Sequence, residues 1–331
     1  MIMTASYARG ANGPRAVLPA EEFRGAMQRG EVVLHYQPQV ELRTMVVSGA
    51  EALIRWRHPA AGDLPPDDFL PAIAHTPVMP SVTDWVMLTA AQEAAAWSEL
   101  SVAVNISAAD ATRPGLVPAV RQALDTSGLP PSRLILEVTE HAIVGDLDRA
   151  TRNLADLAAD GVRVSLDDFG TGYSSLLYLR ELPIHEIKID RVFTTGIGTN
   201  HDDDAIVAAL VKLGHAIGVR VVAEGVETTE QMNVLMSLDC DAAQGFLFGC
   251  AAERLVLPTL PDRPSAARPT QNRRRRGESV ATPAAAVLIR QLVDEGASLH
   301  TIAACLNKDG LRTAQGTRWV AATVGRALTQ L

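Results

Sequence analysis

The feature that most constrains this chain is a repeated alternation of short β-rich runs with segments of helical periodicity. Between Leu18 and Leu257 the sequence contains eight predicted strands, at 32–40, 45–56, 101–107, 133–140, 162–170, 186–191, 220–227 and 242–249. Strands that alternate with helices over roughly 250 residues are typical of a (β/α)8 barrel. The sequence therefore predicts an α/β fold, a modified (β/α)8 TIM-like barrel.

The first two predicted strands are joined by only a few residues around Arg43. A parallel crossover needs about a dozen residues or more, so we expect this pair to be antiparallel, unlike a regular barrel. Two of the later connections carry apolar residues at helical spacing. They are Leu147, Ala150, Leu154 and Leu157 in the first, and Ile206, Leu210, Leu213 and Ile217 in the second.

The charge distribution divides the chain into an acidic body and a basic end. Residues 265–331 hold ten Arg and Lys against four Asp and Glu, a net charge of +6, whereas the whole chain carries −8. The Pro- and Arg-rich stretch between these parts has no apolar period and is typical of a linker. We predict four regions: a leader over 1–17, the barrel over 18–257, a linker over 258–280, and a helical module over 281–331.

The predicted module consists of three short helices. We expect the first over about 283–295 and the second over 299–308, with Ser298 as its N-cap. A third helix would place Val320, Val324 and Leu328 on one face. We expect Trp319, at the start of that helix, to belong to the core of the module.

The composition excludes several classes of protein. With three cysteines and no CxxC pair, the chain has neither a disulfide framework nor a zinc-knuckle spacing, which favours a reducing, cytoplasmic location. No run reaches the roughly 18 apolar residues that span a bilayer, and the first residues lack the apolar core of a signal peptide. We therefore expect a cytoplasmic protein without a membrane segment.

Carboxylates and amides recur at or near the ends of the predicted strands. They are Glu51, Asn105, Glu137, the adjacent pair Asp167 and Asp168, and Glu224. The carboxyl ends of barrel strands meet at one rim, where active sites lie. Oxygen ligands favour Mg²⁺ or Mn²⁺ over zinc, and two such ions suit displacement at phosphorus. A solvated strand-end acid or turn residue is the better explanation of any single acid, but the whole set favours a metal site in which Lys188 orients or deprotonates a water.

At this point the motifs identify a family. The chain resembles the EAL-domain phosphodiesterases, which hydrolyse the bacterial second messenger cyclic di-GMP to linear pGpG. The matching stretches are YQPQV (36–40), EALIRW (51–56), VNIS (104–107), LEVTE (136–140), DDFGTGYSS (167–175), IKID (187–190), AEGVET (223–228) and QGFLFG (244–249). The resemblance covers residues 18–250 and implies a homodimer formed through the barrel.

The resemblance also implies a role for each matching residue. One metal ion is expected on Glu51, Asn105, Glu137 and Asp167, and a second on Asp167, Asp168 and Glu224. The catalytic set would be Glu51, Lys188, Gln244, which lies beside the metal-bound water, and Glu227, which supports Lys188 or substrate. Gln37 and Arg55 match substrate-contacting positions, and Glu140 matches the acid that anchors the loop over 167–175.

The chain departs from the family pattern in two places. His75 stands where relatives usually have a glutamate, near the unusual Pro77 and Pro80, and the Lys/Arg-Pro that commonly follows the last strand is missing. We expect His75 to be a surface residue and Cys250 to be small, apolar and buried.

The C-terminal module resembles the helical DNA-binding module of the large serine recombinases. The shared residues are Gly296, Ser298, Ile302, Ala303, Leu306, Asn307, Gly310, Thr313, Gly316 and Trp319. The resemblance implies a helix-turn-helix-like module that binds DNA through residues 273–331, with Arg273–Arg276 on phosphates. A helical cap or a protein-binding appendage is the alternative. For the whole chain, the alternatives to an enzyme are a non-hydrolysing cyclic di-GMP receptor and a DNA-binding regulator.

Overall fold

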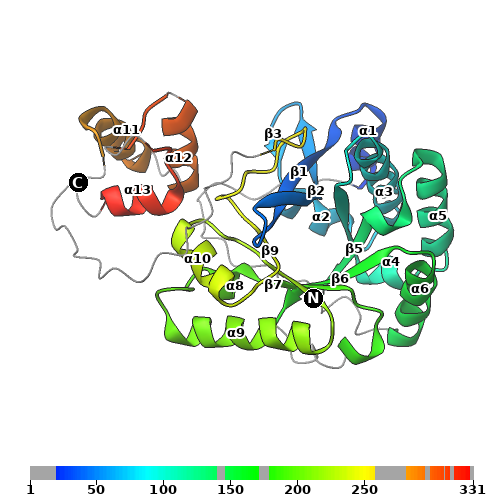
Figure 1. The fold of residues 1–331 in the computed structure, drawn as a ribbon. Helices are drawn as coiled ribbons and strands as arrows, with labels where there is room; N and C mark the ends of the chain where they lie inside the picture. Colours follow the sequence, from blue (N-terminus) through cyan, green and yellow to red (C-terminus); the bar gives the residue numbers. More distant parts are fainter. Residues whose placement is uncertain are drawn as a thin grey trace. The chain divides into compact units, whose positions relative to one another are not determined.

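The computed structural model describes residues 20–139, 146–170, 179–257, 281–294, 299–308, 310–313 and 317–328. They form two compact units, the first up to Leu257 and the second from Ala281 onward (Figure 1). The predicted leader over 1–17 and linker over 258–280 lie outside the described residues.

The first unit is a closed barrel. Its strands are β1 (Val32–Glu41), β2 (Val46–His58), β3 (Gly62–Leu64), β4 (Ser101–Ile106), β5 (Leu134–Thr139), β6 (Arg163–Phe169), β7 (Glu186–Ile189), β8 (Arg220–Ala223) and β9 (Ala242–Gln244). All but β3 close in the order β1-β9-β8-β7-β6-β5-β4-β2, with β2 pairing back to β1. This arrangement confirms the modified TIM-like barrel. The pair β1 and β2 is antiparallel as predicted, and β1 is antiparallel to β9 as well.

Several predicted strands are longer in the sequence pattern than in the structure. The last predicted strands end at Ala223 and Gln244, so the rest of AEGVET and QGFLFG forms loops. Gly225 has a φ of +68°, and a Cβ there would lie 2.4 Å from the Cβ of Arg191. A strand cannot continue through such a turn. The short strand β3, which pairs with the end of β2, was not predicted from the sequence.

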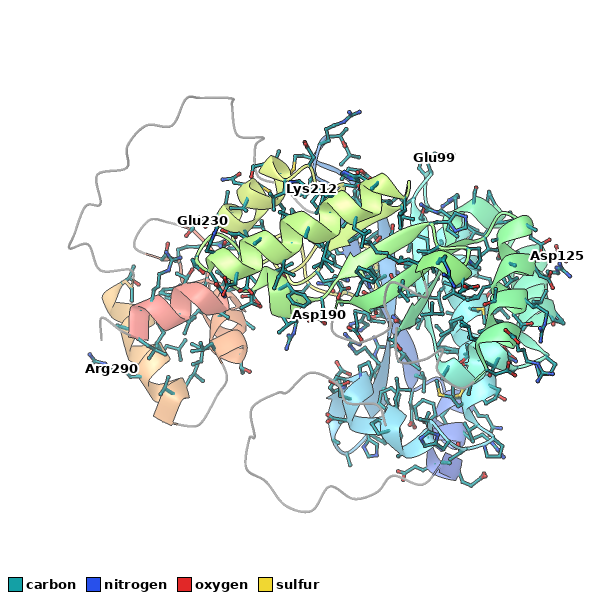
Figure 2. All side chains as sticks on the ribbon, turned by 90° about the horizontal axis from the view of Figure 1, so that it is seen from below. Glu99, Asp125, Asp190, Lys212, Glu230 and Arg290 are labelled. Carbon is teal, nitrogen blue, oxygen red and sulfur yellow. The ribbon has the colours of Figure 1, made fainter. Side chains whose placement is uncertain are left out.

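Helices cover the outside of the barrel (Figure 1). They are α1 (Ala20–Gln28), α2 (Pro66–Ile73), α3 (Met79–Ala95), α4 (Ala108–Thr112), α5 (Leu116–Ser127), α6 (Leu147–Ala159), α8 (Arg191–Thr194), α9 (His201–Ala216) and α10 (Thr229–Ser237). The apolar core lies between these helices and the outward-facing side chains of the strands. Charged residues such as Asp125 on α5 and Lys212 on α9 are exposed (Figure 2).

The predicted helical periodicity holds for both segments, but the buried face of α9 differs from the predicted series. In α9, Ile206 is 39% exposed, and Ile217, just beyond the helix, is 44% exposed. The buried residues are Val207, Val211 and Gly214. A Cβ at Gly214 would lie 2.4 Å from Val221 Cγ2, so the helix approaches β8 through its smallest residue. This close approach sets the rotation of α9.

Two predictions on single residues have different outcomes. His75, between α2 and α3, is exposed, as expected of a surface residue. Cys250 is also exposed, so the prediction that it is buried is wrong. It lies after β9 in the segment over 250–257, which bridges to Tyr36 of β1 through Ala252 and in which no residue is buried. The buried cysteine is Cys240.

The second unit contains α11 (Pro283–Asp294), α12 (Leu299–Lys308) and α13 (Ala321–Leu328). Its core is formed by Ala285, Ile289, Ile302, Leu306, Trp319, Val324 and Ala327, with other apolar residues against them. Trp319 is 2% exposed, which confirms its expected place in the core. The side chain of Asn307 fixes the chain before α13. Its Nδ2 donates to the carbonyl oxygen of Trp319, and its Oδ1 accepts from the N–H of Trp319. Ser298 lies outside the described residues.

Among the described helices, none combines the length and hydropathy that a bilayer span requires.

Candidate active site

Lys188 lies at the centre of a cluster of carboxylates inside the barrel. Its side chain, on β7, is fully buried, at 0% exposure. Its Nζ forms ion pairs with Glu224 at 2.6 Å, Glu137 at 3.0 Å, Asp167 at 3.4 Å and Glu51 at 3.5 Å. The structure thus brings together acids from β2, β5, β6 and the loop after β8, as the sequence predicted.

Strand register explains why these side chains meet. Side chains alternate between the two faces of a strand, so one face of each strand lines the interior. Gln37 on β1 pairs with Glu51 on β2, and Asn105 on β4 pairs with Glu137 on β5. Glu51, however, lies in the middle of β2 and not at its end. The strand continues beyond the barrel because its last residues pair with β1 and β3.

Asp167 and Asp168 are neighbours in β6, and regular pleating would send them to opposite faces. Asp168 instead has a φ of 56°, and the pairing of β6 with β7 shifts register between Leu166 and Phe169. A bulge of this kind redirects a side chain. Asp167, Asp168 and Glu224 each bring a carboxylate oxygen within 4.8 Å of the others.

The cluster shifts the ionisation of its members. Burial and the negative charges of Asp167 and Glu51 raise the pKa of Glu224 to about 8, although the positive charge of Lys188 lowers it. Burial and the charge of Asp167 raise the pKa of Asp168 to about 7. The pKa of Lys188 is well above its usual value, because the four carboxylates outweigh the effect of burial.

Glu51 behaves differently from the other acids. Its burial favours the neutral form, but Lys188 and the hydrogen bonds from Gln244 and Asn105 lower its pKa below the usual value. Asn105 Nδ2 donates to Glu51 Oε1 at 2.7 Å, and Gln244 Nε2 donates to Glu51 Oε2 at 2.6 Å. Glu51 is therefore held as an ionised acceptor.

The donor set fits divalent cations. Four carboxylates pair with one ammonium group and a fifth, Asp168, adjoins them, which is more acid than Lys188 can neutralise and is why the pKa values of Asp168 and Glu224 are raised. Among the described residues, the buried Glu137 Oε1 accepts no hydrogen bond. The buried Asp167 Oδ1 likewise accepts none and has only the ion pair with Lys188. Buried oxygens without donors are costly unless a cation binds them. The all-oxygen set is the kind that Mg²⁺ and Mn²⁺ prefer.

Of the remaining predicted site residues, Gln37 and Arg55 lie beside this cluster. Gln37 accepts from Gln244 Nε2 at 3.0 Å. Arg55 is half-buried on the same face of β2 as Glu51, and its burial lowers its pKa. Glu227 lies half-buried in the loop between β8 and α10, where its N–H donates to Gln231 Oε1 at 2.8 Å. Glu140 lies outside the described residues.

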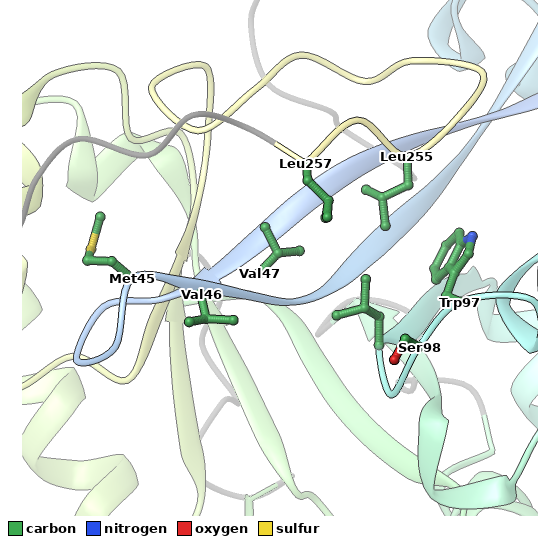
Figure 3. A pocket seen from close by; sticks show the side chains of 8 residues that line it. Met45, Val46, Val47, Trp97, Ser98, Leu255 and Leu257 are labelled. Carbon is green, nitrogen blue, oxygen red and sulfur yellow. The ribbon is translucent and has the colours of Figure 1, made fainter.

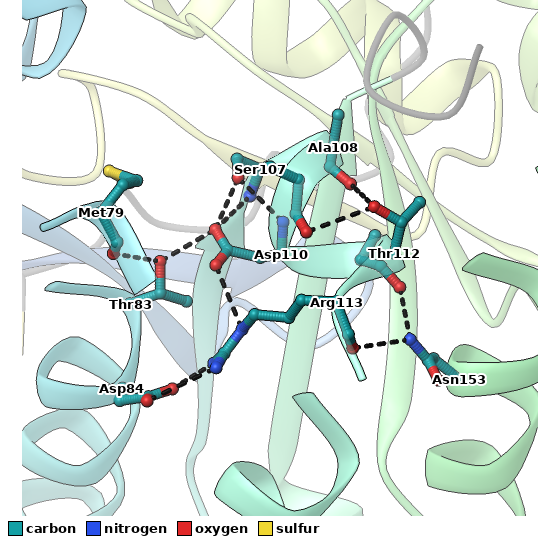
Figure 4. A network of polar contacts seen from close by, with 11 residues as sticks. Met79, Thr83, Asp84, Ser107, Ala108, Asp110, Thr112, Arg113 and Asn153 are labelled. Atoms are coloured by element: carbon teal, nitrogen blue, oxygen red, sulfur yellow. Dashed lines mark hydrogen bonds and ion pairs between the residues drawn. The ribbon is translucent and has the colours of Figure 1, made fainter. Parts of the chain in front are cut away.

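A polar network around Asp110, which joins α3 to the start of α4, was not predicted from the sequence (Figure 4). Asp110 Oδ2 accepts from Ser107 Oγ at 2.5 Å, from Ser107 N at 3.2 Å and from Thr83 Oγ1 at 2.9 Å. Ser107 and Asp110 form a capping box at the start of α4, two residues after Asn105. The S-x-x-D spacing was the available signal, since an acid at that position can bond back to the N-cap.

Replacing Asp110 with alanine should lower the free energy of unfolding by roughly 1–3 kcal/mol, because donors on the buried Thr83 and the half-buried Ser107 lose their acceptor. Urea unfolding followed by circular dichroism measures the change. Asp125→Ala, on the exposed face of α5, is the matched control and should leave the midpoint unchanged. Equal midpoints for both variants would contradict this role of Asp110.

An apolar pocket of about 500 Å³ lies at the other end of the strands, where β2 and β4 begin (Figure 3). Its lining includes Val46, Val47, Trp97, Leu255 and Leu257. None of the carboxylates lines it. The carboxylate cluster therefore lies away from this pocket, on the side of the barrel where active sites of this type are found.

Comparison with known proteins gives consistent results. Residues 20–251 match the family model described as "EAL domain". Over 253 residues the chain is 43% identical to the bifunctional diguanylate cyclase/cyclic di-GMP phosphodiesterase MucR of Pseudomonas aeruginosa, covering 74% of this chain and 37% of MucR. Over 233 residues it is 41% identical to the cyclic di-GMP phosphodiesterase NbdA of the same organism, covering 69% and 30%. The chain thus spans about a third of the length of these curated relatives.

Solved structures of EAL domains are similar to this chain in both sequence and fold. The PaMucR phosphodiesterase in complex with c-di-GMP is 43% identical, with a TM-score of 0.67 over 70% of this chain and 96% of that one. An EAL domain protein from Listeria monocytogenes is 32% identical, with a TM-score of 0.65 over 71% and 94%.

Proposed function

The chain belongs to the EAL domain family, and we propose that it is a metal-dependent phosphodiesterase that hydrolyses cyclic di-GMP to linear pGpG. The observation that carries the proposal is the complete cluster around Lys188. Every carboxylate and amide that the family pattern implies for the metals is present, and the described ones converge at one end of the barrel. A receptor that has lost hydrolysis has no need for this costly concentration of buried charge.

Two divalent ions, Mg²⁺ or Mn²⁺, fit the cluster. Glu51, Asn105, Glu137 and Asp167 would hold one, and Asp167, Asp168 and Glu224 the other. The unpartnered Glu137 Oε1 and the close approach of Asp167, Asp168 and Glu224 support this division. When bound, the ions supply Lewis-acid stabilisation of negative charge at phosphorus and acidify coordinated water.

Lys188 would orient the attacking water. Because its pKa is raised, Lys188 is an ammonium group and would act as a hydrogen-bond donor to the water rather than as its base. Gln244 lies beside it through their shared contact with Glu51 and would hold the water in line with phosphorus. Glu227 would support Lys188 or the substrate.

Arg55 would bind a substrate phosphate and Gln37 a neighbouring polar group. An arginine matches phosphate oxygens through two parallel N–H donors.

In the proposed reaction the oxygen of one water bonds to phosphorus, the bond from phosphorus to the ribose 3′ oxygen breaks, and the 3′ oxygen takes up the proton that the water loses. The ring opens and leaves a linear dinucleotide with a 5′ phosphate.

The decisive experiment incubates the purified chain with cyclic di-GMP and Mn²⁺ or Mg²⁺, followed by chromatography for pGpG. A parallel sample with EDTA tests the metal requirement. Binding of cyclic di-GMP without pGpG would favour the receptor alternative.

Three further assignments accompany this proposal. We propose that the chain forms a homodimer through the barrel. Light scattering after size-exclusion chromatography tests this stoichiometry. We propose separately that Glu140 anchors the loop over 167–175. We also propose that the chain acts in the cytoplasm, which its three free cysteines support.

DNA binding through residues 273–331 is a second proposed function. It is favoured by the basic charge of this region and by exposed arginines of the second unit, including Arg312, Arg318 and Arg326. The three helices have their own apolar core, so the unit is suited to study as a fragment. A protein-binding appendage is the alternative.

The fragment over 265–331 should bind duplex DNA with an affinity that falls steeply with salt, because each neutralised phosphate releases counterions. Replacing Arg273–Arg276 with alanine should weaken binding to all sequences about equally, since phosphate contacts carry no sequence information. Gel-shift titrations of fragment and full chain at two salt concentrations measure this. The acidic barrel should weaken binding by the full chain. No shift for either at low salt would remove the DNA proposal.

A further inference from the structure

A chain of amide hydrogen bonds crosses the barrel interior beside the carboxylates. Gln39 Nε2 donates to Gln244 Oε1 at 3.1 Å, and Gln244 Nε2 donates both to Glu51 Oε2 at 2.6 Å and to Gln37 Oε1 at 3.0 Å. Gln37 Nε2 then donates to the carbonyl of Gly249 at 3.2 Å. All the donors in this chain are primary amides, and each amide has two ends that differ chemically.

Glu51 fixes the direction of this chain. Its carboxylate already accepts from Asn105 and pairs with Lys188, so it offers only acceptor oxygens to Gln244. The NH₂ group of Gln244 must therefore face Glu51, and its Oε1 must point the other way. That oxygen is directed at Gln39, which has to present a donor.

Gln39 is built into the wall of the barrel. It is 3% exposed on β1 and pairs in register with Gln244 on β9. It also lines a polar cavity of about 150 Å³ on the amino-terminal side of the site, together with Arg163, Glu186 and Arg220. The family pattern assigns a role to Gln37 and Gln244 but none to Gln39.

We propose that Gln39 is a positioning residue that holds the amide of Gln244 in the one orientation that places its NH₂ group toward Glu51 and Gln37. This inference rests on the proposed function. Without Gln39, the Gln244 oxygen loses its donor and the amide becomes free to rotate. With an acceptor in place of Gln39, the amide turns over and presents its oxygen to the carboxylate of Glu51.

The test compares Gln39→Leu with Gln39→Glu in the full chain, assayed with cyclic di-GMP and Mn²⁺. The leucine variant should lower kcat about tenfold and the glutamate variant about a hundredfold, with smaller changes in KM. A residue that only fills the polar cavity predicts the opposite order, because a glutamate can accept from the buried Arg163 Nε, which has no acceptor among the described residues, whereas a leucine cannot. An equal or reversed order of kcat would overturn the inference.

A double-mutant cycle and a control complete the design. In a Gln244→Ala background, both Gln39 substitutions should change kcat by less than about twofold, since Gln39 acts through Gln244. Undiminished effects in that background would also overturn the inference. Ser101→Ala alters the same cavity, where its hydroxyl accepts a hydrogen bond from Arg163 and not from Gln39 or Gln244, and should keep wild-type kcat. Absence of turnover by the wild-type chain would instead refute the proposed function, which separates the two failures.

Discussion

Replacing Glu51 with alanine should abolish hydrolysis of cyclic di-GMP while leaving the barrel folded. Glu51 contacts Lys188, Asn105 and Gln244, and it is a proposed metal ligand. Its loss should remove transition-state stabilisation worth several kcal/mol, which lowers kcat by about a thousandfold or more. Chromatography of pGpG formation at saturating Mn²⁺ measures the effect.

The barrel should survive this substitution because one of five carboxylates around a single ammonium group is removed, which reduces repulsion. Circular dichroism and thermal unfolding check that the variant is folded. Glu253→Ala removes an exposed acid paired with Arg57 and should retain full activity. Wild-type turnover by the Glu51 variant with metal present would refute its assignment as a ligand.

Replacing Lys188 with alanine should lower kcat far more than it weakens substrate binding, because a cation that orients water matters most in the transition state. Steady-state kinetics with cyclic di-GMP separate the two parameters. If KM rises while kcat is unchanged, Lys188 is a binding residue and the proposed role is wrong. Lys212→Ala, on the exposed face of α9, is the matched control (Figure 2).

The Lys188→Ala variant should also have a lower free energy of unfolding than the wild type when no metal is present. Lys188 is the partner of four carboxylates, three of them buried, and removal of one partner from a buried pair costs about 3–5 kcal/mol. Added Mn²⁺ should restore part of the loss, since an ion that binds only the folded chain stabilises it. Thermal unfolding of wild-type and variant protein with and without Mn²⁺ measures both effects. A variant as stable as the wild type in EDTA would show that the carboxylates do not depend on Lys188 for neutralisation.

The sequence by itself determined the architecture of the barrel. Alternating strand and helix patterns fixed the eight barrel strands, and the short connection around Arg43 required an antiparallel first pair. These features are local, because connection length and apolar period depend on neighbouring residues alone. The motifs likewise identified Glu51, Lys188 and Glu224 as members of one site.

Only the tertiary structure decided how those residues face one another. The turn at Asp168 brings two adjacent aspartates to one side, and the contact of Gly214 with Val221 selects the buried face of α9. The hydrogen bond that Gln39 donates to Gln244 joins two residues 205 positions apart in the chain. A bulge, a close helix approach and a hydrogen bond across the barrel depend on which strands lie side by side, and no local spacing in the sequence carries that information.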